Sequence, residues 1–352
     1  MQPALELRNL RKTFGATVAV EGMDLVVPRG ALYGVIGPNG AGKTTCIRMI
    51  MSILFPDSGE LSVLGRRSAL EAKDRIGYLP EERGVYRKMK VGAFLIYMAE
   101  LKGLAAEDAA ARVPRLLQEI GLPGIEGKRC EDLSKGMLQR VQFLAAVIHQ
   151  PDLLILDEPF SGQDPVSVRV LREHILGEHR RGATVLLSTH VMAHAEEMCQ
   201  HVVMIHQGRK VLDEAMAGLR RQFDPRIIYF EPLDENATAS SLDETATASS
   251  LDAHATASGL AANATASSLS AVIGVERVES LDGSYRITLI PGTDPAGMMP
   301  RLAAAVAPAR IELARLRLED VFVRIVTEGS RSQVASEALR ASVTAGAEGV
   351  LA

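Results

Sequence analysis

The chain contains no tryptophan, and aromatic residues make up only 4% of its 352 residues. This scarcity argues against a surface that binds nucleic acid by stacking bases on aromatic rings. The formal net charge of −4 gives no indication of a basic surface for nucleic acid or for an anionic membrane. No uninterrupted apolar run approaches the ~20 residues that a membrane-spanning helix requires. Any role at a membrane would therefore depend on a separate partner.

Cysteine is scarce as well. Cys46, Cys130 and Cys199 are odd in number and far apart in the sequence, so we expect reduced thiols that pack inside the protein. The first residues, Met1–Arg8, lack the basic region and the apolar run of a signal peptide. We therefore expect a cytoplasmic protein.

Apolar residues (47%) and charged residues (23%) have the proportions of an ordinary globular protein, and the length allows more than one domain. Three short apolar runs are typical of strands buried on both faces of a parallel sheet: Leu32–Ile36, Leu153–Leu156 and Thr184–Ser188. The pattern from about 88 to 150 is mostly helical. Residues 1–222 therefore predict one α/β domain with a mixed sheet and a helical subdomain at about 88–150.

The remainder of the chain has a different texture. Residues 235–270 form four tandem nonapeptides, each with one leucine and many small polar residues. Such units can build a solenoid, but here they offer too little apolar area to offset the entropy of ordering, so we expect a disordered insertion. Strand and helix patterns on both sides predict a small C-terminal α/β domain over 223–328, with its last helix from Glu319. A flexible tail is expected over 329–352.

A glycine-rich turn follows the first buried run and opens a helix. The phosphate-loop pattern G-x-x-x-x-G-K-[ST] is matched there by Gly37, Pro38, Asn39, Gly40, Ala41, Gly42, Lys43 and Thr44. Glycines let the backbone wrap around phosphates with its N–H groups pointing inward, and the helix start adds positive potential. Lys43 is placed to reach the β- and γ-phosphates, and the Thr44 hydroxyl can ligate Mg²⁺. The pattern predicts a nucleoside triphosphate site.

A second buried run ends in two carboxylates, Asp157 and Glu158. The first suits the coordination sphere of Mg²⁺, which takes carboxylate and water ligands beside phosphates. The second is placed to polarise an attacking water. A strand that merely ends in two solvated acids is the alternative interpretation.

The segment Leu133-Ser134-Lys135-Gly136-Met137 carries a third pattern. Read alone it is a helix start, with Ser134 as the N-cap before an apolar stripe. Together with the phosphate loop, the acidic pair and Ser188-Thr189-His190, it resembles the signature of the ATP-binding cassette (ABC) family. The resemblance covers about residues 4–218, with the motifs in the family's order. It implies the fold of a P-loop NTPase, an ABC nucleotide-binding domain.

The resemblance also implies how ATP is bound. Phe14 corresponds to the aromatic residue that stacks on adenine, although a core position in a hairpin is the alternative. Residues Gly37 to Thr45 correspond to the phosphate loop, with Thr45 as its last member. Ser134 and Gly136 correspond to signature residues that contact the γ-phosphate of ATP held by the other subunit.

For hydrolysis, the resemblance implies that Asp157 and Thr44 ligate Mg²⁺ and that Glu158 is the catalytic base. Lys43 stabilises charge on the phosphates, and His190 corresponds to the switch histidine that contacts the γ-phosphate. A histidine after a strand can also be an ordinary surface residue. The segment Ser161–Asp164 resembles the loop that couples the two ATP sites of a dimer.

Two departures from the family's pattern stand out. Glu81 occupies the position of a glutamine that touches Mg²⁺ and senses the membrane partner; a carboxylate can still meet the metal but cannot donate a hydrogen bond while ionised. Lys135 and Met137 stand where glycine and glutamine are commoner. These segments, and the end of the C-terminal unit around Glu319, resemble a drug- and sodium-export-like branch.

The function implied is the ATP-binding and ATP-hydrolysing subunit of an ABC transporter, and the branch resemblance alone implies export. The expected partners are a transmembrane permease and a second ABC subunit, as an ATP-dependent homodimer or a pair of different subunits. We expect no nucleic acid partner, and a location on the inner face of the membrane. Apolar residues in the segment 81–101 either line a docking groove for the permease or belong to the core: Phe94, Leu95, Tyr97 and Met98.

Other classes remain as alternatives. A soluble ABC ATPase acting on ribosomes or nucleic acid is the first, but only one phosphate loop is present, and Lys43 and Asp157 are too close in sequence to flank a long coiled coil. A small-molecule kinase would not need the signature. An ATP-sensing regulator would not need the intact catalytic positions.

Overall fold

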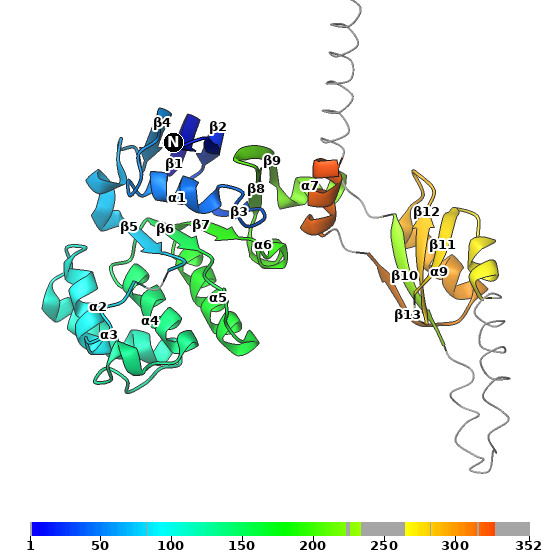
Figure 1. Ribbon diagram of the computed structural model, residues 1–352. Coiled ribbons are helices and arrows are strands. Elements are labelled where there is room, and N and C mark those ends of the chain that lie inside the picture. The colour runs from blue at the N-terminus through cyan, green and yellow to red at the C-terminus, as the bar shows by residue number, and fades with distance from the viewer. Residues whose placement is uncertain are drawn as a thin grey trace, which may run out of the picture. The chain divides into compact units, whose positions relative to one another are not determined.

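The computed structural model describes residues 2–82, 84–222, 226–233, 265–281, 283–314 and 317–327. The chain divides into two compact units, both visible in Figure 1. The first comprises Met1–Leu219 together with Arg317–Ala352, and the second comprises Arg220–Leu316. The α/β prediction is confirmed by sheets and helices in both units.

A six-stranded sheet lies at the centre of the first unit. Its neighbouring strands pair in parallel, except for the last two, which form an antiparallel hairpin. Every residue of the strands β3, β6 and β7 is buried, as their short apolar runs predict. The strand order is β5 (Ile76–Leu79), β6 (Leu153–Asp157), β7 (Thr184–Thr189), β3 (Leu32–Ile36), β8 (His201–His206) and β9 (Arg209–Ala215).

A smaller antiparallel sheet belongs to the same unit. Its order is β2 (Thr17–Val27), β1 (Leu5–Phe14) and β4 (Ser58–Val63). The helix α1 (Lys43–Ile50) joins this sheet and the large one in a shared apolar core, because residues of all three are buried in one cluster. All three cysteines are free and buried, and burial raises the pKa of the Cys46 and Cys199 thiols to about 12.

Helices occupy most of the chain between β5 and β6, where the sequence predicts a helical subdomain. They are α2 (Val91–Glu100), α3 (Ala106–Glu119) and α4 (Lys135–Val147), with a short 3-10 turn at Cys130–Asp132; another 3-10 segment, Ala69–Arg75, directly precedes β5. Lys102 ties this region to the large sheet, because its ammonium group donates hydrogen bonds to the carbonyls of Lys73 and Ile76, each at 2.8 Å. The helical region is therefore anchored at the beginning of β5.

Three further helices follow β6. The helix α5 (Pro165–Arg180) begins as its sequence predicts, because the Asp164 carboxylate accepts hydrogen bonds from the N–H groups of Val166 and Ser167 and proline occupies the first turn. The helix α6 (Met192–Met198) follows β7, and α7 (Met216–Gln222) follows β9.

The second unit is an antiparallel four-stranded sheet with the strand order β11-β12-β10-β13. Along the chain its elements alternate as β10 (Ile227–Pro232), a helix at 265–270, β11 (Val275–Leu281), β12 (Ser284–Leu289), α9 (Pro295–Ala305) and β13 (Pro308–Leu313). This βαββαβ arrangement is ferredoxin-like. The helices supply Leu269, Met298 and Leu302 to the apolar core on one face of the sheet.

The predicted disordered insertion over 235–270 is wrong at its C-terminal end. Residues 265–270 form a helix, and Leu269 is fully buried in the core of the second unit. The reason is tertiary: one leucine per repeat is too little for a solenoid, but the last leucine can pack against an existing sheet. Residues 234–264 lie outside the described part of the chain.

We expect Leu269→Ala to destabilise the second unit by about 2–4 kcal/mol, because the truncation leaves a cavity in a small core. Hydrogen exchange followed by mass spectrometry should show faster exchange in β10 and β12. Ile273→Ala is the control, since Ile273 is 87% exposed. Equal protection in both variants would show that Leu269 does not support the fold.

The last described helix, at 318–327, belongs to the first unit, whereas the sequence analysis placed it in the C-terminal domain. Its Leu318 and Val321 are buried, and the N–H of Leu318 donates to the Glu196 carboxylate of α6. The ring of Phe322 lies 5.5 Å from that of His206, edge to face. This contact between distant segments has no local signature in the sequence. Residues 328–352, where a tail is expected, lie outside the described part.

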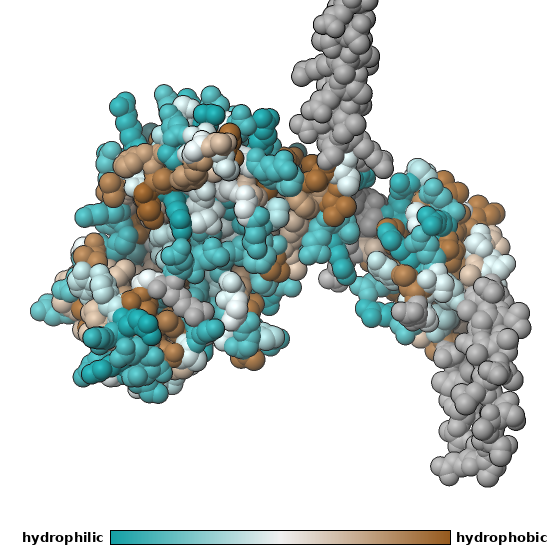
Figure 2. All heavy atoms as spheres, viewed as in Figure 1, coloured by the Kyte–Doolittle hydropathy of each residue, from teal (hydrophilic) through white to brown (hydrophobic). Residues whose placement is uncertain are grey.

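Hydrophilic side chains cover much of the face shown in Figure 2, with apolar patches between them. Within the described ranges, none of the helices combines the length and the apolar character that crossing a bilayer takes.

Candidate functional site

Three strands of the large sheet end at the same place, and each is followed by a predicted site residue. The strands β6, β7 and β3 are neighbours, and all three run in parallel. Gly37 follows β3, Glu158 follows β6, and His190 follows β7. Because the carboxyl ends of parallel strands share one edge, positions far apart in the sequence converge there.

The loop between β3 and α1 requires glycine at both ends. Gly37 has φ 152°, and a Cβ atom there would lie 2.2 Å from the carbonyl oxygen of Ile205. Gly42 has φ 106°, and its Cβ would lie 2.4 Å from the carbonyl oxygen of Ala19. Another residue would therefore need both a strained backbone and displaced neighbours. The two glycines hold the loop close against β8 and β2.

The helix α1 begins directly after Gly42, so its first turn faces the loop. The first N–H groups of a helix have no partner within it and carry partial positive charge. The first turn of α1 contains no acidic residue that would compensate this charge. Thr44 and Thr45 lie in this turn and add hydroxyl groups. The arrangement fits the phosphates of a nucleotide.

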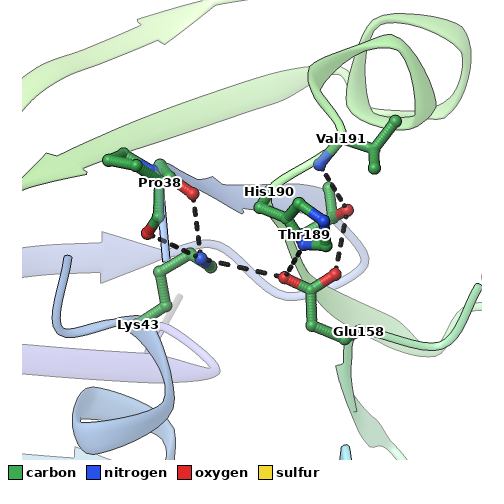
Figure 3. Close-up of polar contacts among 7 residues, drawn as sticks. Pro38, Lys43, Glu158, Thr189, His190 and Val191 are labelled. Atoms are coloured by element: carbon green, nitrogen blue, oxygen red, sulfur yellow. Dashed lines mark hydrogen bonds and ion pairs between the residues drawn. The ribbon is translucent and has the colours of Figure 1, made fainter. Parts of the chain in front are cut away.

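The Lys43 side chain lies inside the phosphate loop, and its ammonium group faces Glu158. Its ammonium group donates hydrogen bonds to the carbonyl oxygens of Gly37 (2.8 Å) and Pro38 (3.1 Å). It also lies 3.7 Å from Oε1 of Glu158, and both side chains are less than a tenth exposed (Figure 3). When ATP binds, such an ammonium group can exchange its hydrogen bonds to the loop carbonyls for stronger ones to charged phosphate oxygens.

Glu158 and His190 face each other across this edge. Nδ1 of His190 lies 2.8 Å from Oε1 of Glu158, and the Thr189 hydroxyl donates to Oε2 at 3.3 Å (Figure 3). Glu158 has φ 49°, which is uncommon for a residue with a side chain, and its N–H donates to the carbonyl of Ser188 at 3.0 Å. The strand ends therefore fix both the backbone and the carboxylate.

The Oε1 atom of Glu158 can accept a further hydrogen bond. Its contacts to Lys43 and His190 lack hydrogen-bond geometry, so among the described residues this buried oxygen has no hydrogen-bond donor. A buried acceptor of this kind, beside the Lys43 ammonium group and the His190 ring, can receive a hydrogen bond from water, as a general base must.

Asp157 is fully buried at the end of β6, and the described residues give neither of its carboxylate oxygens a hydrogen bond. Burial raises the pKa of Asp157; the nearby hydroxyls of Ser188 and Thr44 oppose this shift, while the charges of Glu81 and Glu158 add to it. Two unpaired oxygens near the Thr44 hydroxyl fit a Mg²⁺ ion, which prefers oxygen ligands. No cluster of three or more metal-ligating side chains occurs in the described ranges, so Mg²⁺ would need phosphate and water ligands as well.

Glu81 is exposed after β5, and its charge acts on Asp157. Glu81 therefore lies close enough to Asp157 for its charge to raise the pKa of that carboxylate. Its neighbour Glu82 instead pairs with Arg48 of α1 at 3.2 Å.

Phe14 ends β1 and is 51% exposed, which excludes the alternative that it is a core residue of the hairpin. The ammonium group of Lys12 lies over its ring, 5.8 Å from the centroid. An exposed ring at the end of a hairpin is available for stacking.

The signature residues lie at the start of α4, apart from the cluster around Lys43. Ser134 caps the helix by accepting a hydrogen bond from the N–H of Met137 at 3.3 Å. A Cβ on Gly136 would lie 3.3 Å from the Ser167 hydroxyl of α5. In the described part of the chain, no hydrogen bond or ion pair joins Ser134 or Gly136 to the phosphate loop.

Some residues of the site were not singled out from the sequence. Thr189 holds Glu158 through its hydroxyl, and the same oxygen accepts from the N–H of Val191 at 3.1 Å. A polar residue at the end of an apolar strand was the available signal.

The apolar residues of the segment 81–101 differ in burial, so the core interpretation holds for only some of them. Phe94 and Leu95 are buried and belong to the core. Tyr97 is 38% exposed and packs edge to face against the ring of Tyr86 at 5.6 Å, and Tyr86 is 54% exposed. The exposed aromatic pair is the part available to a partner.

Comparison with known proteins gives the following relatives. Residues 20–161 match the sequence model of the family described as ABC transporter. The uncharacterized ABC transporter ATP-binding protein YhaQ of Bacillus subtilis is 41% identical over 231 residues, which are 66% of this chain and 78% of YhaQ. Nod factor export ATP-binding protein I of Cupriavidus metallidurans is 38% identical over 216 residues, which are 60% of this chain and 71% of that protein.

Solved structures give a consistent result. A structure described as the ATP binding subunit of an ABC transporter superposes with a TM-score of 0.58 at 34% identity, over 63% of this chain and 93% of the other. CbiO1 from Clostridium perfringens has the same fold, with a TM-score of 0.57 at 22% identity, over 64% of this chain and 94% of the other.

Proposed function

Because this chain belongs to the ATP-binding subunits of ABC transporters and is an ATPase of that family, we propose that it drives an exporter through a separate transmembrane permease. The observation that carries the motor role is the contact of Lys43, Glu158 and His190 at one edge of the sheet. A subunit that only sensed ATP would not need a buried carboxylate between the Lys43 ammonium group and the His190 ring. The ATPase would lie in the cytoplasm, on the inner face of the membrane.

The direction of transport rests on similarity. The relative in Cupriavidus metallidurans is named as an export ATP-binding protein, and the substituted motifs around Glu81 and Lys135 resemble an export-like branch. The cargo of that relative is not carried over, because cargo selection belongs to the permease.

The proposed roles at the ATP site follow from the geometry. The phosphate loop and the first turn of α1 bind the phosphates, and Lys43 exchanges its loop carbonyls for phosphate oxygens. Mg²⁺ would be held by Thr44 and Asp157, with Glu81 nearby, and would supply compensation for phosphate charge. Glu158 takes a proton from the attacking water through Oε1, and His190 orients that carboxylate.

Dimerisation would complete the site. Ser134 is exposed, and Val166 at the start of the adjacent α5 is 73% exposed, an unusual position for an apolar side chain. We propose that this surface faces the phosphate loop of a second ABC subunit, which brings Ser134 and Gly136 to its ATP.

The permease would dock on the aromatic pair Tyr86 and Tyr97. Leu101, at the end of α2, is 51% exposed and extends the apolar surface. The segment 81–101 begins at Glu81, whose charge acts on Asp157 in the ATP site. A conformational change at the ATP site can therefore reach the permease through a short stretch of chain.

Affinity purification tests the proposed partner. The Glu158→Gln variant, trapped with ATP in the native host, should retain a polytopic membrane protein in stoichiometric amount from solubilised membranes, identified by mass spectrometry. Lys43→Met, which should bind ATP more weakly, is the control for ATP-dependent association. Ribosomal or nucleic-acid-bound proteins without a membrane partner would favour a soluble ABC ATPase instead.

Metabolite profiling tests the direction. Cells that lack this ATPase should accumulate the cargo inside, and complementation with the wild-type chain but not with Glu158→Gln should reverse the accumulation. Depletion of a compound from the mutant cells would indicate import.

A further inference from the structure

Asp57 makes an unusual number of contacts for a surface residue. It lies immediately before β4, and its carboxylate accepts hydrogen bonds from the Lys12 ammonium (2.7 Å), the Thr13 N–H (2.7 Å) and the Thr13 hydroxyl (2.6 Å). Its own N–H donates to the carbonyl of Arg11 at 2.8 Å. Asp57 therefore fixes three consecutive residues of β1.

These three residues lead directly to Phe14. The Lys12 ammonium, held by Asp57, lies over the ring of Phe14 at 5.8 Å from its centroid. A cation over an aromatic face is attracted to the ring's electrons. The side chain of Lys12 is 16% exposed, whereas Phe14 as a whole is 51% exposed. The ring is thus held by a well-packed cation and still accessible.

The hairpin that carries Phe14 packs against the phosphate loop. Phe14 pairs with Thr17, and two residues further along β2 the carbonyl of Ala19 closely approaches Gly42. Asp57 follows α1 in the chain and directly precedes β4. Asp57 is therefore a link between the segment that follows the phosphate-binding helix and the hairpin.

We propose that Asp57 is a positioning residue for the base of ATP: by holding Lys12 and Thr13, it fixes the ring of Phe14 on which adenine stacks. The inference rests on the proposed stacking role of Phe14. A ring that is already ordered loses less conformational entropy when a ligand stacks on it, so the anchor contributes to ATP affinity without touching ATP.

The hydrogen bond from Lys12, together with those from Thr13, holds the pKa of Asp57 well below its usual range. The carboxylate therefore stays ionised at neutral pH, and the contacts persist where the enzyme works.

A purely structural role makes a different prediction. If Asp57 only secured the pairing of β1 with β4, its loss would loosen the hairpin against Gly42 and disturb the phosphate loop itself. Binding of a ligand with phosphates and no base would then weaken as much as binding of ATP. If Asp57 instead positions Phe14, its loss should weaken binding only of the ligand that carries a base.

The experiment compares two ligands on the full-length chain, each with Mg²⁺: ATP by calorimetry, and tripolyphosphate by competition. Phe14→Ala should weaken ATP roughly tenfold, since stacking on one aromatic ring is typically of that size. Asp57→Ala and Lys12→Met should each weaken ATP roughly threefold to tenfold and leave tripolyphosphate unchanged. In a Phe14→Ala background, Asp57→Ala should have no further effect.

Asp152 provides a control of the same construction. It also directly precedes a strand, β6, its carboxylate accepts from Arg75 at 2.6 Å, and its N–H donates to the carbonyl of Arg75 at 2.9 Å. It lies at the amino end of that strand, at the opposite edge of the sheet from Glu158. Asp152→Ala should change neither affinity. Asp57→Asn preserves the shape and tests the charge if Asp57→Ala does not fold, and it should give a smaller selective loss for ATP.

Three outcomes would overturn the inference. If Phe14→Ala weakens ATP but the Asp57 and Lys12 variants do not, Phe14 stacks without an anchor and the inference alone fails. Equal weakening of ATP and tripolyphosphate by the Asp57 variants assigns Asp57 a scaffold role. Unchanged ATP affinity in Phe14→Ala removes the stacking role, and the inference fails with it.

Discussion

Replacing Glu158 by glutamine should reduce ATP hydrolysis by about 10²–10⁴-fold, the range that a general base contributes. The substitution keeps the shape of the side chain but replaces the carboxylate between Lys43 and His190 by a neutral amide, which cannot take a proton from water. ATP binding should be retained, because the phosphate loop is untouched. The variant should therefore accumulate as an ATP-bound dimer, measurable by phosphate release and by light scattering after size-exclusion chromatography.

Glu82→Gln is the control for this experiment, because it removes a neighbouring carboxylate whose side chain is 86% exposed. It should hydrolyse ATP at the wild-type rate. A Glu158→Gln variant that also hydrolyses at the wild-type rate would remove Glu158 from the role of base, and Asp157 would then be the next carboxylate to test.

Replacing Lys43 by methionine should weaken ATP binding by roughly 10–100-fold, since hydrogen bonds to charged groups contribute about 1.5–3 kcal/mol each. Methionine preserves most of the apolar stem of the side chain but lacks the ammonium group. In the wild type this group would exchange its hydrogen bonds to the carbonyls of Gly37 and Pro38 for hydrogen bonds to phosphate oxygens. Binding of tripolyphosphate should weaken in parallel with binding of ATP, whereas the Asp57 variants should leave tripolyphosphate binding unchanged. Hydrolysis at saturating ATP should also fall, because the same charge stabilises the transition state.

Lys73→Met tests whether loss of any lysine has this effect. Lys73 is exposed, and its backbone carbonyl accepts a hydrogen bond from Lys102, which the substitution retains. Its ATP affinity should match the wild type. Wild-type affinity in Lys43→Met would show that Lys43 does not contact the phosphates and that the backbone of the loop and the first turn of α1 bind them without it.

The chemistry of the site could be predicted because its parts are local. A glycine-rich loop between an apolar strand and a helix, and an acidic pair at a strand end, are recognisable within a few residues of sequence. Their convergence also follows from the sequence once the strands are assigned to one parallel sheet, since strand ends share an edge. The exposed Phe14 and the buried Lys43 agree with this interpretation.

Other features could not be predicted because they depend on contacts between distant positions. Phe94 and Tyr97 lie on the same helix with similar apolar character, and only packing decides that the first is buried and the second 38% exposed. Leu269 is the last of four equivalent leucines, yet it packs into a core. Repeat sequence alone gives each leucine the same environment.

The sequence by itself determined the α/β class, the phosphate-loop pattern and the pair of carboxylates at the end of β6. Short sequence patterns suffice for these features, because they specify strands, turns and chemical groups. Tertiary structure decided where the helix at 318–327 packs, since the contact of Leu318 with Glu196 joins positions 122 residues apart. It also decided that Asp57 holds Lys12, because the two residues are 45 positions apart and no local sequence pattern connects them. Side chains that meet only after folding leave no periodicity in the chain, so their partners emerge only from the packed structure.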